Sequence, residues 1–107
     1  MNEERVALLK KYIVDEPDEP FNHYALANEY MAEHAEKALI LLKELLKKFP
    51  DYLPTYYQAA HLLESFEEEQ EALSVYQRGI ALAKKQGNAK IERELQTAWL
   101  NLSFEMD

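Results

Sequence analysis

The side chains of this sequence that could perform chemistry are three histidines and two runs of carboxylates. His23, His34 and His61 stand singly, each on or near a different expected helix, whereas a metal site needs its ligands at one point. The acidic runs 15–19 and 67–69 lack the ligand spacing and the central glycine of a calcium loop. Carboxylates are also common at helix starts, where they complement the helix dipole. We therefore predict no metal site and keep a metal carrier or enzyme built on the three histidines as the least favoured hypothesis.

No catalytic motif accompanies these residues. The sequence contains no glycine-rich phosphate loop, no Gly-x-Ser-x-Gly elbow and no His-Glu-x-x-His pair. It also contains no cysteine, which excludes a disulfide framework, thiolate zinc ligands and a cysteine nucleophile. The sequence thus predicts no catalytic residue, no cofactor and no enzymatic activity.

The charge balance restricts the class of partner. The chain has 12 Lys and Arg against 20 Asp and Glu, a net charge of −8, and phosphate binding requires clustered cations. Nucleic acid is therefore an unexpected partner. The start is acidic and the longest apolar run, 38–42, is broken by Lys43, so we expect neither a secretory signal nor a membrane span. These features predict a cytoplasmic protein with a protein or peptide partner.

Composition and periodicity define the elements that must position any site. A chain of 107 residues, 48% of them hydrophobic, has enough apolar material for one core, and two glycines are too few for a hairpin-rich β fold. Apolar residues recur at helical spacing between prolines and Gly87. We predict an all-α fold of six helices, with Gly87 as a left-handed cap of the fifth: 2–14, 20–30, 35–48, 54–65, 68–84 and 89–104. Short connections make neighbouring helices antiparallel, as helical hairpins.

The hairpins repeat. Ala38 is followed by Ala72 after 34 residues, and Leu42 by Tyr76. Small residues such as Ala38 and Ala72 allow close helix packing. The same packing explains Gly79, since glycine inside a helix costs about 1 kcal/mol relative to alanine and helix propensity does not favour it.

This pattern resembles the tetratricopeptide repeat family. Residues 53–84 resemble one repeat, 20–50 another, 2–16 the second half of a repeat, and 88–105 a capping helix, all within one domain. The resemblance implies a right-handed superhelical stack of antiparallel hairpins. Neither hairpin turn has the family's usual glycine, since His34 and the pair Glu67-Glu68 stand there.

Stacked hairpins leave a concave surface lined by the first helix of each hairpin. Helical phase places seven polar and aromatic side chains there, with Glu64 and Trp99 beyond them: Tyr24, Asn28, Tyr57, Gln58, His61, Arg93 and Gln96. The alternative is that these residues are partly core and partly ordinary surface.

Two hypotheses for function follow. The first hypothesis is a non-catalytic interaction module whose concave groove binds a peptide or protein segment. Some family members hold a peptide carboxylate with cations and asparagines, but only Asn28 and Arg93 match that clamp here. We therefore expect a basic or aromatic segment in the groove. The second hypothesis is a structural protein that self-associates weakly through apolar side chains at the two ends of the stack: Val6 and Tyr12 at one end, and Trp99, Leu100 and Phe104 at the other.

Overall fold

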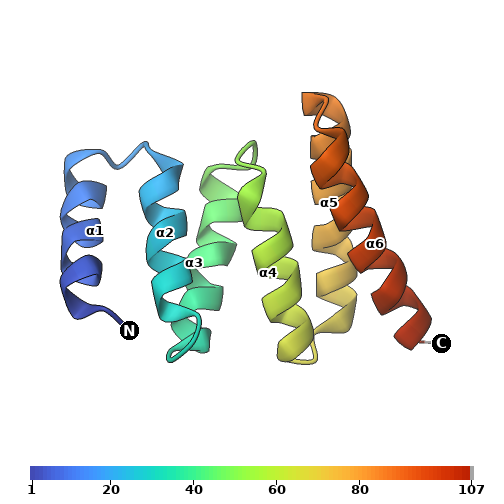
Figure 1. The fold of residues 1–107 in the computed structure, drawn as a ribbon, viewed down its shortest axis with the longest axis horizontal. Helices are drawn as coiled ribbons and strands as arrows, with labels where there is room; N and C mark the ends of the chain where they lie inside the picture. The colour runs from blue at the N-terminus through green and yellow to red at the C-terminus, as the bar shows by residue number, and fades with distance from the viewer. Residues whose placement is uncertain (107) are drawn as a thin grey trace. The chain divides into compact units, whose positions relative to one another are not determined.

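The computed structural model describes residues 1–106, and within that range it contains six helices and no strand (Figure 1). The helices are α1 (Glu3–Asp15), α2 (Pro20–Tyr30), α3 (Ala35–Lys48), α4 (Pro54–Ser65), α5 (Glu69–Gln86) and α6 (Ala89–Glu105). The predicted all-α fold and its number of helices are confirmed. The predicted bounds differ by one or two residues, mainly at the C-terminal end of α5.

Local sequence signals explain where the helices begin and end. The Asn2 side chain caps α1 by accepting the amide N–H of Arg5 at 3.0 Å, and Asn88 caps α6 through Ile91 in the same way. Pro20 occupies the first turn of α2, where its missing N–H has no cost. Gly87 ends α5 with φ of 70°, the left-handed cap expected from the sequence.

In the turn between α4 and α5, a residue other than glycine adopts a left-handed conformation. Glu67 itself adopts the left-handed conformation, with φ of 60°. The amide of Glu68 then donates to the carbonyl oxygen of Leu63 at 2.9 Å, which closes the end of α4 as a glycine would. The turn before α3 differs, because His34 has φ of −136°. Of these two hairpin turns, only the one between α4 and α5 therefore contains a left-handed residue.

The contacts divide the chain into two compact units, Met1–Thr55 and the residues from Tyr56 onward. The first unit contains α1, α2 and α3, with α2 packed against both neighbours. The second contains nearly all of α4 together with the α5–α6 pair. The repeat alanines Ala38 and Ala72 are completely buried, one in each unit, and so are Ala27 in the first unit and Ala60 in the second.

Gly79 occupies the tightest place in the second unit. A Cβ atom added there would lie 2.8 Å from Tyr56 Cβ and 3.0 Å from Leu95 Cδ1. The glycine therefore lets α5 approach α4 and α6 at once. This close approach is the packing role that the sequence predicted for it.

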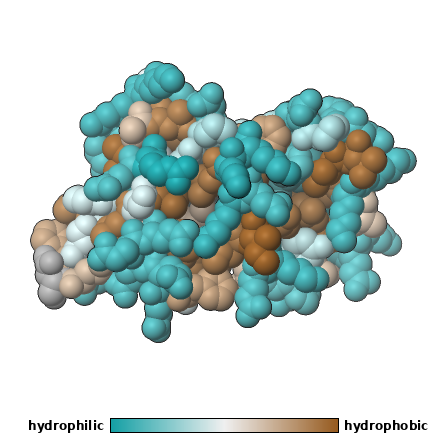
Figure 2. Space-filling model, turned by 180° about the vertical axis from the view of Figure 1, so that it is seen from behind, coloured by the Kyte–Doolittle hydropathy of each residue, from teal (hydrophilic) through white to brown (hydrophobic). Residues whose placement is uncertain are grey.

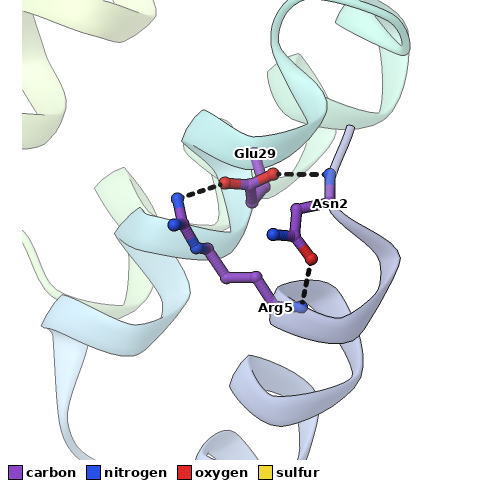
Figure 3. A network of polar contacts seen from close by, with 3 residues as sticks. All are labelled: Asn2, Arg5 and Glu29. Atoms are coloured by element: carbon purple, nitrogen blue, oxygen red, sulfur yellow. Dashed lines mark hydrogen bonds and ion pairs between the residues drawn. The ribbon is translucent and has the colours of Figure 1, made fainter.

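A polar network fastens α1 to α2 in the first unit (Figure 3). The Glu29 carboxylate accepts hydrogen bonds from Arg5 Nη1 at 2.9 Å and from the backbone N–H of Asn2 at 3.2 Å. These hydrogen bonds hold the pKa of Glu29 below its ordinary value of 4.5, the Asn2 bond contributing most. One carboxylate of α2 thus secures both the capping residue and the first turn of α1.

One expected end surface is only partly present. Val6 is buried, 8% exposed, because it lies on the face of α1 that packs on α2, so its assignment to an exposed apolar end is wrong. Tyr12, Leu100 and Phe104 are exposed as expected, and Trp99 is mostly covered. Figure 2 shows hydrophobic residues scattered among hydrophilic ones on the face that it displays.

Candidate functional site

A cleft of about 880 Å³ lies between α4 and α6 in the second unit, with one residue of α5 in its wall. Its lining, which we call the α4–α6 cleft, mixes aromatic, charged and amide side chains: Tyr57, His61, Glu64, Tyr76, Lys90, Arg93, Glu94, Thr97, Ala98, Asn101 and Glu105. This cleft lies wholly within the second unit.

Aromatic rings form the α4 side of the cleft. Tyr57 and His61 are one helical turn apart, and their rings stack with centroids 6.0 Å apart and planes 15° apart. Tyr76 of α5 meets the Tyr57 ring edge-on at 6.3 Å. Because Tyr76 is buried, it fixes one side of Tyr57, whereas Tyr57 as a whole residue is 40% exposed. The result is a supported, solvent-facing aromatic surface.

Glu64 extends this surface by one further turn of α4. Its Oε2 atom accepts a short hydrogen bond from the Tyr76 hydroxyl. Burial, together with that bond, raises the pKa of the Tyr76 phenol far above its ordinary value of 10.0. The phenol is therefore a permanent donor that orients the Glu64 carboxylate.

The α6 side of the cleft is a polar stripe. Its residues recur at spacings of three and four, which places them on one helix face: Lys90, Arg93, Glu94, Thr97, Asn101 and Glu105. Three carboxylates, those of Glu64, Glu94 and Glu105, line the cleft against two cations. The cleft thus carries a small excess of negative charge.

The predicted groove residues are divided between the two units. Tyr57, His61 and Arg93 line the α4–α6 cleft, whereas Gln58 and Gln96 are not among its lining residues. Gln96 Nε2 instead donates to Glu92 at 3.1 Å along α6. Tyr24 and Asn28 belong to the first unit, where Tyr24 meets Tyr52 edge-on at 5.7 Å and Asn28 is exposed. A single surface that unites all seven stays a prediction.

Sequence reasoning missed most of the α6 wall. Lys90, Glu94, Thr97, Asn101 and Glu105 were not singled out, although their helical spacing is readable in the sequence. From the sequence, Tyr76 was used only as a repeat position and was not connected with the cleft. Its ring is buried, but its hydroxyl reaches a carboxylate in the cleft wall.

The three histidines each have a separate neighbour. His23 Nε2 donates to the Pro17 carbonyl oxygen at 3.0 Å, and the His34 ring lies against Tyr30. The third, His61, stacks on Tyr57. Across residues 1–106, no three His, Cys, Asp or Glu side chains come together as a metal site would require. No helix in this range is both long enough and apolar enough to span a bilayer.

Comparison with solved structures identifies the class of protein. The solution structure of a tetratricopeptide repeat domain protein from Salinibacter ruber is 39% identical, with a TM-score of 0.77 over 81% of this chain and 89% of that one. A crystal structure of a tetratricopeptide repeat domain protein from the same organism is 38% identical, with a TM-score of 0.76 over 79% and 96% of the two chains. This chain therefore belongs to the tetratricopeptide repeat family.

One further solved structure supports the fold, and two other comparisons found no match. The solution structure of a protein from Bordetella parapertussis has the same fold, with a TM-score of 0.78 at 22% identity over 94% of this chain and 88% of that one. No protein-family model and no curated protein matches the chain. Family membership indicates, in general terms, a protein-interaction module.

Proposed function

We propose that the protein is a non-catalytic interaction module whose α4–α6 cleft binds an extended peptide or protein segment. The observation that supports this most directly is the aromatic surface of Tyr57 and His61 beside a cleft of about 880 Å³. Tyrosine offers a large contact area at a low entropic cost, and for this reason aromatic residues are enriched where proteins bind one another.

The chemistry of the cleft defines the partner class. Its carboxylates outnumber its cations, and the whole chain carries a net charge of −8. Electrostatic complementarity then favours a basic segment, and the exposed ring of Tyr57 favours an aromatic or planar side chain within it. Tyr24 and Asn28 are proposed to form a second contact area in the first unit.

Selection from a library of random twelve-residue peptides displayed on phage tests this function. Peptides selected on the immobilised chain are expected to lose about tenfold in affinity with Tyr57→Ala or His61→Ala, because such aromatic contacts typically dominate binding energy. Each variant has a matched control. Tyr12→Ala removes a tyrosine of nearly equal exposure (43% against 40%), and His34→Ala removes a histidine that also lies against a tyrosine.

The controls should change affinity by less than about twofold, as expected for residues outside the interface. Two results would contradict the proposal: selected peptides that bind Tyr57→Ala as tightly as the unaltered chain, or a selection that enriches no peptide at all.

A further inference from the structure

Glu64 is a half-buried carboxylate that forms no ion pair with any cation among residues 1–106. Its Oε2 atom receives the Tyr76 hydroxyl, and among residues 1–106 neither Lys90 nor Arg93 forms an ion pair with it, although both line the same cleft. A neutral phenol satisfies one hydrogen bond but brings no positive charge to the carboxylate. Removing a charge from water without a counter-charge is unfavourable, so the free protein holds a carboxylate prepared for a cation.

The surroundings of Glu64 favour one kind of cation. Tyr57, His61 and Glu64 follow one another along α4 at spacings of four and three, so a carboxylate lies at the end of a stacked pair of rings. Tyr76 supports both ends of this arrangement, since its ring meets Tyr57 and its hydroxyl holds Glu64. A flat cation can therefore contact the rings with its face and the carboxylate with its edge.

We infer that the α4–α6 cleft recognises an arginine side chain of the partner segment, with its guanidinium paired to Glu64 and stacked on Tyr57 and His61. This inference rests on the proposed function and names the chemistry of its partner. Guanidinium is planar, presents donors in a fixed fork that matches a carboxylate, and stacks on aromatic faces. The ammonium group of lysine is strongly hydrated and lacks that fork, so it satisfies only part of the site.

Two capped hexapeptides provide the test. One carries a single arginine beside a phenylalanine between glycine and serine residues, and its twin carries citrulline, a neutral isostere, in place of arginine. Binding to the whole isotopically labelled chain is followed by nuclear magnetic resonance titration. We expect the arginine peptide to bind about tenfold more tightly than its twin, as is typical of hydrogen bonds between charged groups.

Variants assign this preference to Glu64. Glu64→Gln should reduce the ratio of the two affinities to about one, because the amide keeps the shape but loses the charge. Glu94→Gln removes the same charge from the same cleft and should keep most of the preference. Tyr76→Phe tests the positioning residue: it should weaken the arginine peptide about threefold and leave the citrulline twin unchanged, since it removes one orienting hydrogen bond.

Equal affinities of the twins for the unaltered chain, or an arginine preference that survives in a folded Glu64→Gln variant, would overturn the inference. Loss of the preference in Glu94→Gln to the same extent as in Glu64→Gln would also overturn it, because the preference would then reflect general charge. The proposed function fails separately. Library peptides that depend on Tyr57 but not on arginine would preserve it, whereas no peptide binding at the cleft would overturn both.

Discussion

At the scale of single residues, Gly79 sets the spacing of three helices. An alanine methyl group there would meet Tyr56 Cβ at 2.8 Å, and that atom is attached to the backbone of α4, so it cannot rotate away. Overpacking typically costs 1–3 kcal/mol, of which better helix propensity returns about 1 kcal/mol.

We therefore expect Gly79→Ala to lower the free energy of unfolding by about 1 kcal/mol, measured from urea denaturation. Gln77→Ala, an exposed change in the same helix, is the control and should leave the unfolding midpoint nearly unchanged. A Gly79→Ala variant more stable than the unaltered chain would show that α4 and α6 shift enough to accommodate the added methyl group.

Tyr76 makes a prediction about alkaline pH. Because its pKa is raised in the folded state, folded and unfolded chains bind this proton equally below pH 10.0, and only the unfolded chain releases it above that value. Stability is therefore unaffected by this group below pH 10.0 and falls as pH rises further. Tyr52, whose pKa burial also raises, contributes in the same direction.

Tyr76→Phe should make the loss of stability above pH 10.0 shallower, as measured by urea denaturation at a series of pH values. An identical alkaline slope in this variant and the unaltered chain would mean that the Tyr76 phenol ionises in the folded state.

At the scale of elements, the α4–α5 turn carries strain in Glu67. A side chain in the left-handed region costs about 1–2 kcal/mol, and glycine avoids this cost but loses about 0.4–1 kcal/mol through its more flexible unfolded chain. Glu67→Gly should therefore stabilise the protein by about 0.5–1 kcal/mol in thermal unfolding.

The same substitution two residues later should have the opposite effect. Glu69→Gly introduces glycine into the first turn of α5 and should destabilise by about 0.5–1 kcal/mol. Destabilisation by both variants would argue against the left-handed turn.

The α1–α2 connection should weaken in acid. Glu29 has a lowered pKa when folded, so its contribution to stability is present above pH 4.5 and is lost as pH falls through the folded pKa. Glu29→Gln should thus lose less stability on acidification than the unaltered chain, as measured by urea midpoints at decreasing pH.

Arg5→Gln provides a graded comparison. It removes one of the two donors to Glu29 and leaves the Asn2 amide, so its acid dependence should lie between those of Glu29→Gln and the unaltered chain. Unaltered acid dependence in both variants would contradict the network shown in Figure 3.

Helices and their ends could be predicted from sequence because their signals are local. The caps at Asn2 and Asn88 and the left-handed Gly87 act within one turn. The left-handed Glu67 could not be predicted, since glutamate has no intrinsic preference for that conformation and only the closed hairpin imposes it. Local preference therefore predicts elements better than it predicts the turns forced by packing.

The candidate site was predictable on the α4 side and much less so on the α6 side. Tyr57 and His61 could be identified because helical phase places both on the side of residues 54–65 that lines the expected concave surface. The bond from Tyr76 to Glu64 joins residues 12 positions apart, and its partners depend on how α4 and α5 pack rather than on either helix alone. Such contacts between helices require the structure.

At the scale of the whole molecule, the negative net charge and the membership of a family of interaction modules both favour a protein or peptide partner. In the proposed function, the net charge of −8 favours basic segments at long range, and the aromatic surface and Glu64 are proposed to select among them at contact distance. The alternative, weak self-association through the ends of the stack, stays a prediction, and its exposed apolar side chains are Tyr12, Leu100 and Phe104. A peptide that binds at these end residues, and not in the α4–α6 cleft, would contradict the proposed binding site.

The most direct test of the central claim is a chemical-shift map of the labelled chain with a library-selected peptide. Binding in the α4–α6 cleft predicts that the largest shifts occur at Tyr57, His61, Glu64 and Arg93, with small shifts along α1. Largest shifts at Tyr12, Leu100 and Phe104, with the cleft residues unperturbed, would contradict the account.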